Sequence, residues 1–247
     1  MNNDVTFFTN CYERDWKTII IEGGMERKIE NLNYNFSNKV LIITNVSDRN
    51  TVESELTKIK DKKVIDEYYF TDDSSKETLD FFDINEDTFN GGYWYSIAPL
   101  TAILKCETEY MLYLTSDVVV ENKDYNWIDE GIKLIKNNEI IKVVNPIWNL
   151  NHNEAQYEED FYINLGFPSM GNNKDWFHTV NFSDQCFLIR TQDFKKKIYN
   201  LKDELSDLHY PGYAGESFEK RVSSFLKKNK FYRLTSKNVT YYHPRWW

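Results

Sequence analysis

A single carboxylate interrupts an apolar run in the middle of the chain. Tyr110–Leu114 is continuously apolar and Val118–Val120 is β-branched, with Asp117 between them. Such a run is typical of a strand in a parallel sheet that is covered on both faces. Burying Asp117 without a partner would be costly, and open α/β sheets bind ligands at the carboxyl ends of their strands. We therefore expect Asp117 either to meet a cation or donor at that edge or to emerge into a solvated loop.

The segments before Asp117 alternate between two kinds of pattern. Short apolar runs at Val5–Thr9, Lys39–Thr44 and Lys63–Phe70 predict strands. The longer stretches between them, Asp15–Asn31 and Thr51–Lys60, predict crossovers that contain helices. This alternation is typical of a parallel sheet flanked by helices.

The second half of the chain is less regular. A strand is predicted at Ile140–Pro146 and another at Gln185–Arg190, and a late helix and a short strand follow. Between the two strands, Ile147–Val180 is rich in Asn, aromatic residues and Gly and shows no sustained period. This composition fits a long excursion over an active site better than a framework element.

The composition excludes several classes of protein. A chain of 247 residues without a visible linker predicts one large domain. Its 39 acidic and 30 basic residues give a net charge of −9, which argues against a broad nucleic-acid interface. No apolar run approaches transmembrane length, no secretory signal is visible, and the three cysteines are too far apart for a disulfide framework. We expect a cytoplasmic protein that binds no nucleic acid.

The order of these elements resembles the GT-A fold of nucleotide-sugar-dependent glycosyltransferases, family 2 in particular. The resemblance runs from Val5 to Leu234 and is strongest in GGYWYSIAPLTAILKCETEYMLYLTSDVVV, which is similar to that family's helix, acidic turn, apolar strand and Asp-x-Asp segment. It implies a single α/β domain with a mainly parallel, Rossmann-like sheet flanked by helices. It also implies a nucleotide-binding half over about residues 1–120 and an acceptor-binding half over about residues 121–247.

The resemblance implies a divalent metal. In GT-A enzymes the Asp-x-Asp acids bind Mn²⁺ or Mg²⁺, which neutralises the charge of the donor diphosphate as a Lewis acid. On this chain the second acid falls on Asp117 and the first on Thr115. Asp117 is therefore a predicted metal ligand, and Thr115 lowers the expected affinity and leaves metal-independent binding open. His243 is a second candidate ligand, because some GT-A families use a C-terminal histidine, although a lone histidine is more often structural.

The resemblance also places a general base near the late helix. In inverting GT-A enzymes an acid at the start of such a helix often takes the proton of the acceptor hydroxyl, which is a poor nucleophile at neutral pH. Glu216 in GYAGESFEKR matches that place. Glu216 can equally be an acid that the helix dipole favours in a first turn, and Glu219 is the competing base.

The loops after the first two predicted strands resemble the donor-binding region of these enzymes. Polar residues at successive strand ends favour a nucleotide crevice, although Asn, Ser and Asp are also ordinary turn formers. We expect a UDP-, GDP- or dTDP-sugar there, with Tyr12 stacked on the base. The residues predicted to bind the donor are Thr9, Asn10, Tyr12, Asn45, Asp48 and Ser116.

The leading prediction is a glycosyltransferase that moves a monosaccharide to a hydroxyl group of a glycan or glycoconjugate, with inversion. One alternative is a sugar nucleotidyltransferase, although the first loop lacks the glycine-rich, basic phosphate cradle that such activation uses. Another is a non-catalytic nucleotide- or glycan-binding module, motivated by Thr115. For Trp246–Trp247, closure over the donor, packing on the core and peripheral contact with a membrane or partner all stay open.

Overall fold

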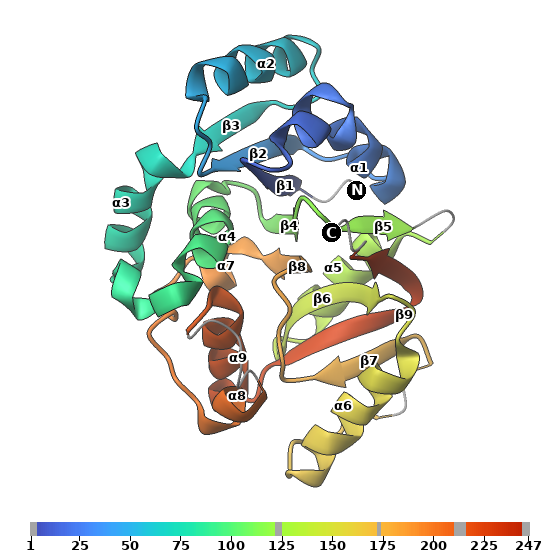
Figure 1. Cartoon of the computed structure of the whole chain (residues 1–247). Coiled ribbons are helices and arrows are strands. Elements are labelled where there is room, and N and C mark those ends of the chain that lie inside the picture. The colour runs from blue at the N-terminus through green and yellow to red at the C-terminus, as the bar shows by residue number, and fades with distance from the viewer. Residues whose placement is uncertain (1–3, 122–124, 172–173, 210–215, 244–247) are drawn as a thin grey trace.

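The computed structural model describes residues 4–121, 125–171, 174–209 and 216–243 (Figure 1). One sheet runs through the molecule, and helices pack on both of its faces. Within the described residues no helix is both long and apolar enough to cross a membrane. The pair Trp246–Trp247 lies outside the described residues, so its predicted contacts stay predictions.

The described residues form a nine-stranded sheet in the order β3-β2-β1-β4-β8-β6-β9-β5, and β7 pairs with β9 at its side. The strands are β1 (Val5–Tyr12), β2 (Asn38–Thr44), β3 (Glu67–Phe70), β4 (Tyr110–Leu114), β5 (Val119–Glu121), β6 (Ile141–Trp148), β7 (Trp176–Thr179), β8 (Cys186–Arg190) and β9 (Tyr232–Tyr242).

The N-terminal part of the sheet is parallel. β1 pairs in parallel with β2 and β4, and β2 pairs in parallel with β3. The register places Thr9 beside both Leu41 and Leu114, so the carboxyl ends of β1, β2 and β4 meet at one edge. β8 is antiparallel to its neighbours β4 and β6, and β6 and β9 are parallel again. The predicted α/β fold with a mainly parallel sheet is confirmed.

Helices pack on both faces because successive side chains of a strand point in opposite directions. Phe7 lies in the core with Met25 and Leu56, whereas Phe8 lies in the core with Leu100 and Val222. The helices are α1 (Gly24–Leu32), α2 (Arg49–Asp61), α3 (Thr71–Phe82), α4 (Tyr93–Lys105), α5 (Trp127–Asn137), α6 (His152–Asn164), α7 (Thr191–Phe194), α8 (Glu204–His209) and α9 (Phe218–Asn229), with short turns η1 (Lys17–Ile21), η2 (Glu86–Thr88) and η3 (Asn90–Gly92).

Two segments differ from the sequence-based expectation. The third strand begins at Glu67 rather than Lys63, because Lys63 has a left-handed φ of 60° at the end of α2. The expected excursion Ile147–Val180 contains regular structure, namely α6 and β7. The buried residues of α6 are Ala155 and Tyr162. Because two buried positions do not make a helical period, the sequence of α6 shows no apolar pattern.

Gly92 allows α4 to begin against the main chain that precedes α9. A Cβ atom at this position would lie 2.1 Å from the carbonyl oxygen of Glu216. Because that oxygen belongs to the main chain, Gly92→Ala must displace one of the two segments. We expect the free energy of unfolding to fall by about 1 to 3 kcal/mol, measured by chemical denaturation. Wild-type stability of the variant would contradict this tight approach.

Candidate active site

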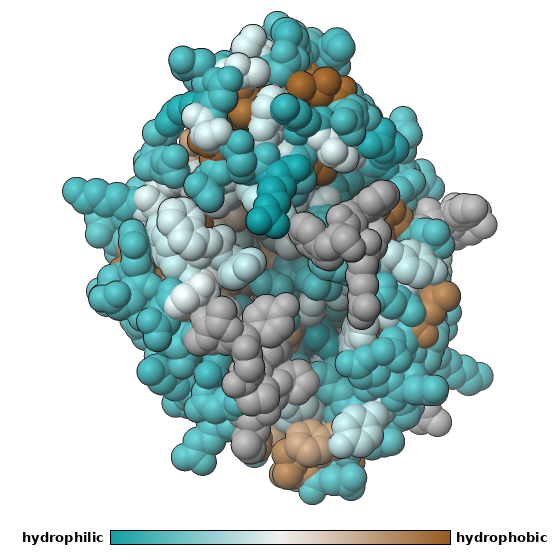
Figure 2. Space-filling model, viewed as in Figure 1, coloured by the Kyte–Doolittle hydropathy of each residue, from teal (hydrophilic) through white to brown (hydrophobic). Residues whose placement is uncertain are grey.

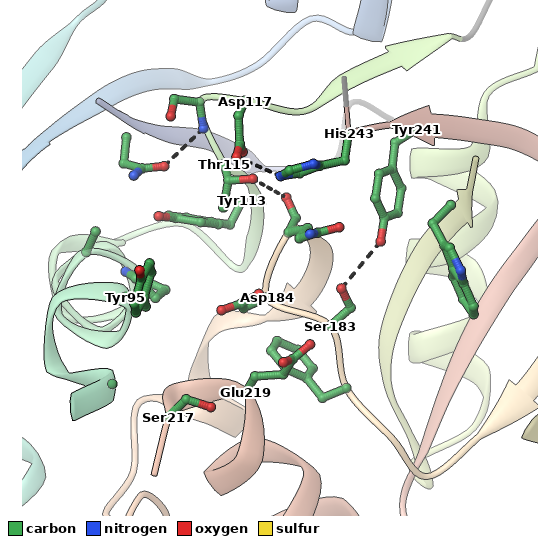
Figure 3. A pocket seen from close by; sticks show the side chains of 18 of the residues that line it. Tyr95, Tyr113, Thr115, Asp117, Ser183, Asp184, Ser217, Glu219, Tyr241 and His243 are labelled. Carbon is green, nitrogen blue, oxygen red and sulfur yellow. Dashed lines mark hydrogen bonds and ion pairs between the residues drawn. The ribbon is translucent and has the colours of Figure 1, made fainter. Parts of the chain in front are cut away.

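A cleft of about 1550 Å³ opens at the carboxyl ends of β1, β2 and β4. Its walls come from the loop after β1, the start of α4, the turn between β4 and β5, α6, the segment before β8 and the start of α9. Figure 3 shows labelled residues of the α4, β4–β5, β8 and α9 walls. Hydrophilic side chains predominate on the face of the molecule seen in Figure 2. The cleft therefore lies at the edge where the sequence predicts a ligand.

Asp117 and His243 contact each other in the wall of the cleft (Figure 3). The Oδ2 atom of Asp117 lies 2.7 Å from Nε2 of His243, and their side chains are 31% and 29% exposed. β5 and β9 pair in antiparallel register with Val119 opposite Tyr242, which brings the residues that flank this pair together. Both predicted metal ligands thus lie side by side within reach of solvent.

Lys28 supports the turn that carries Asp117. The Nζ atom of Lys28, on α1, donates to the carbonyl oxygens of Thr115, at 3.1 Å, and Val118. Burial lowers the pKa of Lys28 to about 8, against the raising effect of Asp117 and Asp15. Lys28 was not predicted from the sequence, although its place on the buried stripe of α1, three residues after Met25, was a signal for a buried cation.

The same turn is tied to the loop after β1. The backbone N–H of Ser116 donates to Oδ1 of Asn10 at 3.2 Å, and the Ser116 hydroxyl donates to Asp15. Asp15 also accepts the backbone N–H of Tyr12 at 2.7 Å. Burial raises the pKa of Asp15, while the hydrogen bond from Ser116 opposes that rise. The loop and the turn therefore form one hydrogen-bonded unit.

Predicted donor-binding residues fall into two groups. Those that line the cleft are Asn10, Tyr12, Asn45 and Ser116. The structure does not bring Thr9 and Asp48 into its lining. β1 extends to Tyr12, so Thr9 is fully buried inside that strand. Asp48 is the N-cap of α2, where it accepts the backbone N–H of Thr51 at 3.1 Å.

Two acids, Asp184 and Glu219, line the cleft across from Asp117 (Figure 3). Burial raises the pKa of Glu219 well above its ordinary value, and the charge of Asp184 raises it further. Burial also raises the pKa of Asp184, to about 6, and the charge of Asp117 adds to this effect. Because neighbouring carboxyls cannot easily ionise together, we expect the two to hold one proton between them near neutral pH.

Asp184 was not predicted from the sequence, because it precedes a strand rather than following one. β8 is antiparallel to β4, with Cys186 opposite Leu114, so the amino end of β8 lies at the same edge as the carboxyl end of β4. The direction of β8 cannot be read from the residues of Gln185–Arg190. An acid immediately before that predicted strand was the available signal.

Glu216, the predicted base, is placed differently from Glu219. The helix α9 begins at Phe218 with Ser217 as its N-cap, so Glu216 precedes the helix and Glu219 lies in its first turn. The Glu216 carboxylate pairs with Arg221 at 3.2 Å and Lys220 at 3.4 Å. Ser217 and Glu219 line the cleft, whereas Glu216 is not among the described residues that line it. The geometry therefore favours Glu219 and Asp184 over Glu216 for contact with a ligand.

A divalent metal fits the donor set at Asp117 and His243. Within the described ranges, no three His, Cys, Asp or Glu side chains are gathered as a complete site. Two donor atoms 2.7 Å apart on an open wall suit a cation that takes its other ligands from phosphate and water, as Mg²⁺ often does in nucleotide sites.

No family model and no curated protein matches the sequence, but solved structures match the fold. GalNAc-T7 with UDP, GalNAc and Mn²⁺ has a TM-score of 0.55 at 12% identity, over 98% of this chain and 44% of that one. The mannosyltransferase PcManGT from Pyrobaculum calidifontis with GDP-Man and Mn²⁺ has a TM-score of 0.52 at 9% identity, over 100% of this chain and 59% of that one. The chain has the GT-A fold.

The resemblance drawn from the sequence is thus confirmed at the level of the fold. Both structures contain a nucleotide or nucleotide sugar together with Mn²⁺. Identities of 9% and 12% show the fold and leave activity to be argued from the residues of the cleft. This GT-A chain spans 44% and 59% of the length of the two enzymes.

Proposed function

We propose that the protein transfers a monosaccharide from a nucleotide-diphosphate sugar to a hydroxyl group of a carbohydrate or glycoconjugate acceptor. The observation that carries this proposal is the contact between Asp117 and His243 at 2.7 Å, in a cleft that also contains Asp184 and Glu219. The cleft therefore joins candidate ligands for a diphosphate-bound cation to acids that can serve an acceptor hydroxyl.

The donor binds, in this proposal, at the loop after β1 and the turn after β4. Tyr12 stacks on the base, and Asn10, Asn45 and Ser116 bind the nucleoside of a UDP-, GDP- or dTDP-sugar. The backbone N–H of Ser116 donates to the Asn10 side chain, and the Ser116 hydroxyl donates to Asp15, so both side chains are oriented before the ligand arrives. These residues lie within about 1–120, the proposed nucleotide-binding half, whereas His243 comes to the diphosphate from the other end of the chain.

Asp117 and His243 would hold Mn²⁺ or Mg²⁺. Bound there, the cation would neutralise charge on the leaving diphosphate as the glycosidic bond breaks. Thr115 contributes no carboxylate, so we propose that this cation binds more weakly than at a site with two acids. Lys28 keeps the turn in place through the carbonyl oxygens of Thr115 and Val118.

For the acceptor side we propose Asp184, rather than Glu216, as the base. Its pKa of about 6 leaves it mostly ionised at neutral pH, while burial raises the pKa of Glu219 well above its ordinary value and so disfavours its ionised form. Asp184 takes the proton of the acceptor hydroxyl, whose oxygen attacks the anomeric carbon, and the nucleoside diphosphate leaves with the bonding electrons. An acceptor-side base serves direct displacement with inversion, which the anomeric coupling constant of the product tests.

Calorimetry with UDP, GDP and dTDP tests the donor site. We expect one of these nucleotides to bind, and to bind more tightly with Mn²⁺ than with a chelator present, because a cation held by Asp117 and His243 would neutralise charge on the diphosphate. Hydrolysis of the corresponding nucleotide sugar with Mn²⁺ would then separate an enzyme from a binding module. Failure of all three nucleotides to bind would contradict the proposal, and release of pyrophosphate from a nucleoside triphosphate would favour a nucleotidyltransferase.

A further inference from the structure

The helix α6 turns one face toward the cleft. The lining residues that it contributes have the i, i+3, i+4, i+7, i+8 spacing of a single helical face, and they are Glu154, Tyr157, Glu158, Phe161 and Tyr162. Tyr157 and Phe161 are 71% and 42% exposed. Their rings are stacked, with centroids 6.4 Å apart and an interplanar angle of 26°. α6 thus presents a pair of aromatic side chains to the cleft.

Core packing does not account for these two rings. α6 anchors itself through Ala155 and Tyr162, which are buried, whereas Tyr157 and Phe161 remain exposed. Large exposed apolar side chains that gather at a concave surface mark binding sites more often than isolated ones do. The face of α6 therefore requires an explanation outside the fold itself.

A second pair of exposed aromatic residues lines the same cleft from the start of α4. Trp94 and Tyr95 are 58% and 65% exposed, and both belong to the cleft lining. Figure 3 shows Tyr95 on the α4 wall, beside the space that Asp184 and Glu219 border. The cleft therefore has aromatic side chains on two of its walls and acids between them.

The charges around the α6 face restrict the ligand. Glu158 pairs with Arg233 at 2.8 Å, and Glu154 accepts the indole N–H of Trp148 at 3.2 Å. Asp184 and Glu219, which we expect to share one proton, add one further negative charge to this part of the cleft. A phosphorylated or carboxylated ligand would meet repulsion here, whereas hydroxyl groups find carboxylate acceptors. The lining favours an uncharged, polyhydroxylated ligand.

We propose that Tyr157 and Phe161 of α6, together with Trp94 and Tyr95 of α4 in the same cleft, form a binding site for a neutral oligosaccharide acceptor. The inference rests on the proposed function and names the acceptor class of that same cleft. Aromatic faces bind the apolar C–H faces of sugar rings, and the acids bind their hydroxyl groups. One helical turn separates Tyr157 from Phe161, about 6 Å along the axis, so the platform accommodates a chain of sugar rings that leads to Asp184.

Saturation-transfer NMR with three neutral trisaccharides, maltotriose, cellotriose and chitotriose, tests this site. We expect at least one to receive saturation from the wild-type protein and Phe161→Ala to weaken its binding at least tenfold. Phe81→Ala is the matched control, because Phe81 is also 42% exposed and lies on α3 outside the cleft lining. Tyr157→Ala, at a position 71% exposed, is a second test that should not disturb folding.

The inference would be overturned if none of the three trisaccharides received saturation from the protein. It would also be overturned if Tyr157→Ala and Phe161→Ala bound a trisaccharide as tightly as Phe81→Ala does. Nucleotide calorimetry on the same protein separates this failure from that of the proposed function. Nucleotide binding without trisaccharide binding removes the oligosaccharide site alone. If the protein binds a trisaccharide but no nucleotide, and the Tyr157 and Phe161 variants lose the trisaccharide, the oligosaccharide site is supported and the transferase proposal is removed.

Discussion

Asp117→Asn is expected to remove most of the Mn²⁺-dependent part of donor binding. Asparagine keeps the size of the side chain and one oxygen acceptor, but it loses the charge that a hard cation requires. Loss of a residue that only supports a metal ligand commonly reduces metal affinity by about 10- to 100-fold, so loss of the Asp117 charge should do at least as much, and the nucleotide should then bind almost equally with Mn²⁺ and with a chelator. Calorimetry of the nucleotide under both conditions measures the effect.

Asp48→Asn provides the matched control for Asp117→Asn. Asp48 also follows a parallel strand, but it caps α2 through Thr51 and is absent from the cleft lining among the described residues. Asparagine caps helices about as well as aspartate, so Asp48→Asn should change neither the melting temperature nor the response to Mn²⁺ appreciably. If Asp117→Asn responds to Mn²⁺ as the wild-type protein does, Asp117 is not a metal ligand and its role is limited to the contact with His243.

Asp184→Asn is expected to lower the transfer rate by about 10²- to 10⁴-fold, the usual contribution of a general base. Donor affinity should hardly change, because the donor-binding residues lie on the other wall. Glu219→Gln should have the smaller effect, since burial raises the pKa of Glu219 well above its ordinary value and makes it a poorer candidate for an ionised base. Transfer by the wild-type protein should increase as the pH rises through about 6, where Asp184 loses its proton. These rates can be measured once an acceptor is identified, by following the release of the nucleoside diphosphate.

The stability of Asp184→Asn distinguishes a catalytic acid from a structural one. A raised pKa means that the folded state holds the Asp184 proton more tightly than the unfolded state does. That contribution to stability is fully present below the unfolded pKa and is lost as the pH rises toward about 6. At pH 7 the ionised group is therefore unfavourable for folding, and its removal should not lower the melting temperature. A variant that loses both transfer and stability would contradict this account.

Glu216→Gln is the control for Asp184→Asn in the measurements of transfer and melting temperature. It removes the ion pairs with Arg221 and Lys220, so its melting temperature should fall while transfer remains near normal. If transfer instead falls as far as in Asp184→Asn, Glu216 is the base that the sequence predicted, and the acids of the cleft have another role.

The sequence by itself determined the parallel half of the sheet and the edge at which the ligand site lies. Residues such as Leu41 and Leu112 are buried on a sheet covered on both faces, and this leaves a continuous apolar run that local patterns reveal. Parallel strands end at a common edge, so polar residues after β1, β2 and β4 meet without further information. The placement of Asn10, Tyr12, Asn45, Ser116 and Asp117 around one cleft follows from this rule.

The tertiary structure alone decided which residues complete the site. Pairing of β5 with β9 brings His243 to Asp117 across 126 residues, and the reversed direction of β8 brings Asp184 to the same edge. The end of β1 decides that Thr9 is buried, and the start of α9 decides that Glu219 rather than Glu216 reaches the cleft. Strand direction, register and helix boundaries depend on contacts between distant segments, which no local pattern of residues specifies.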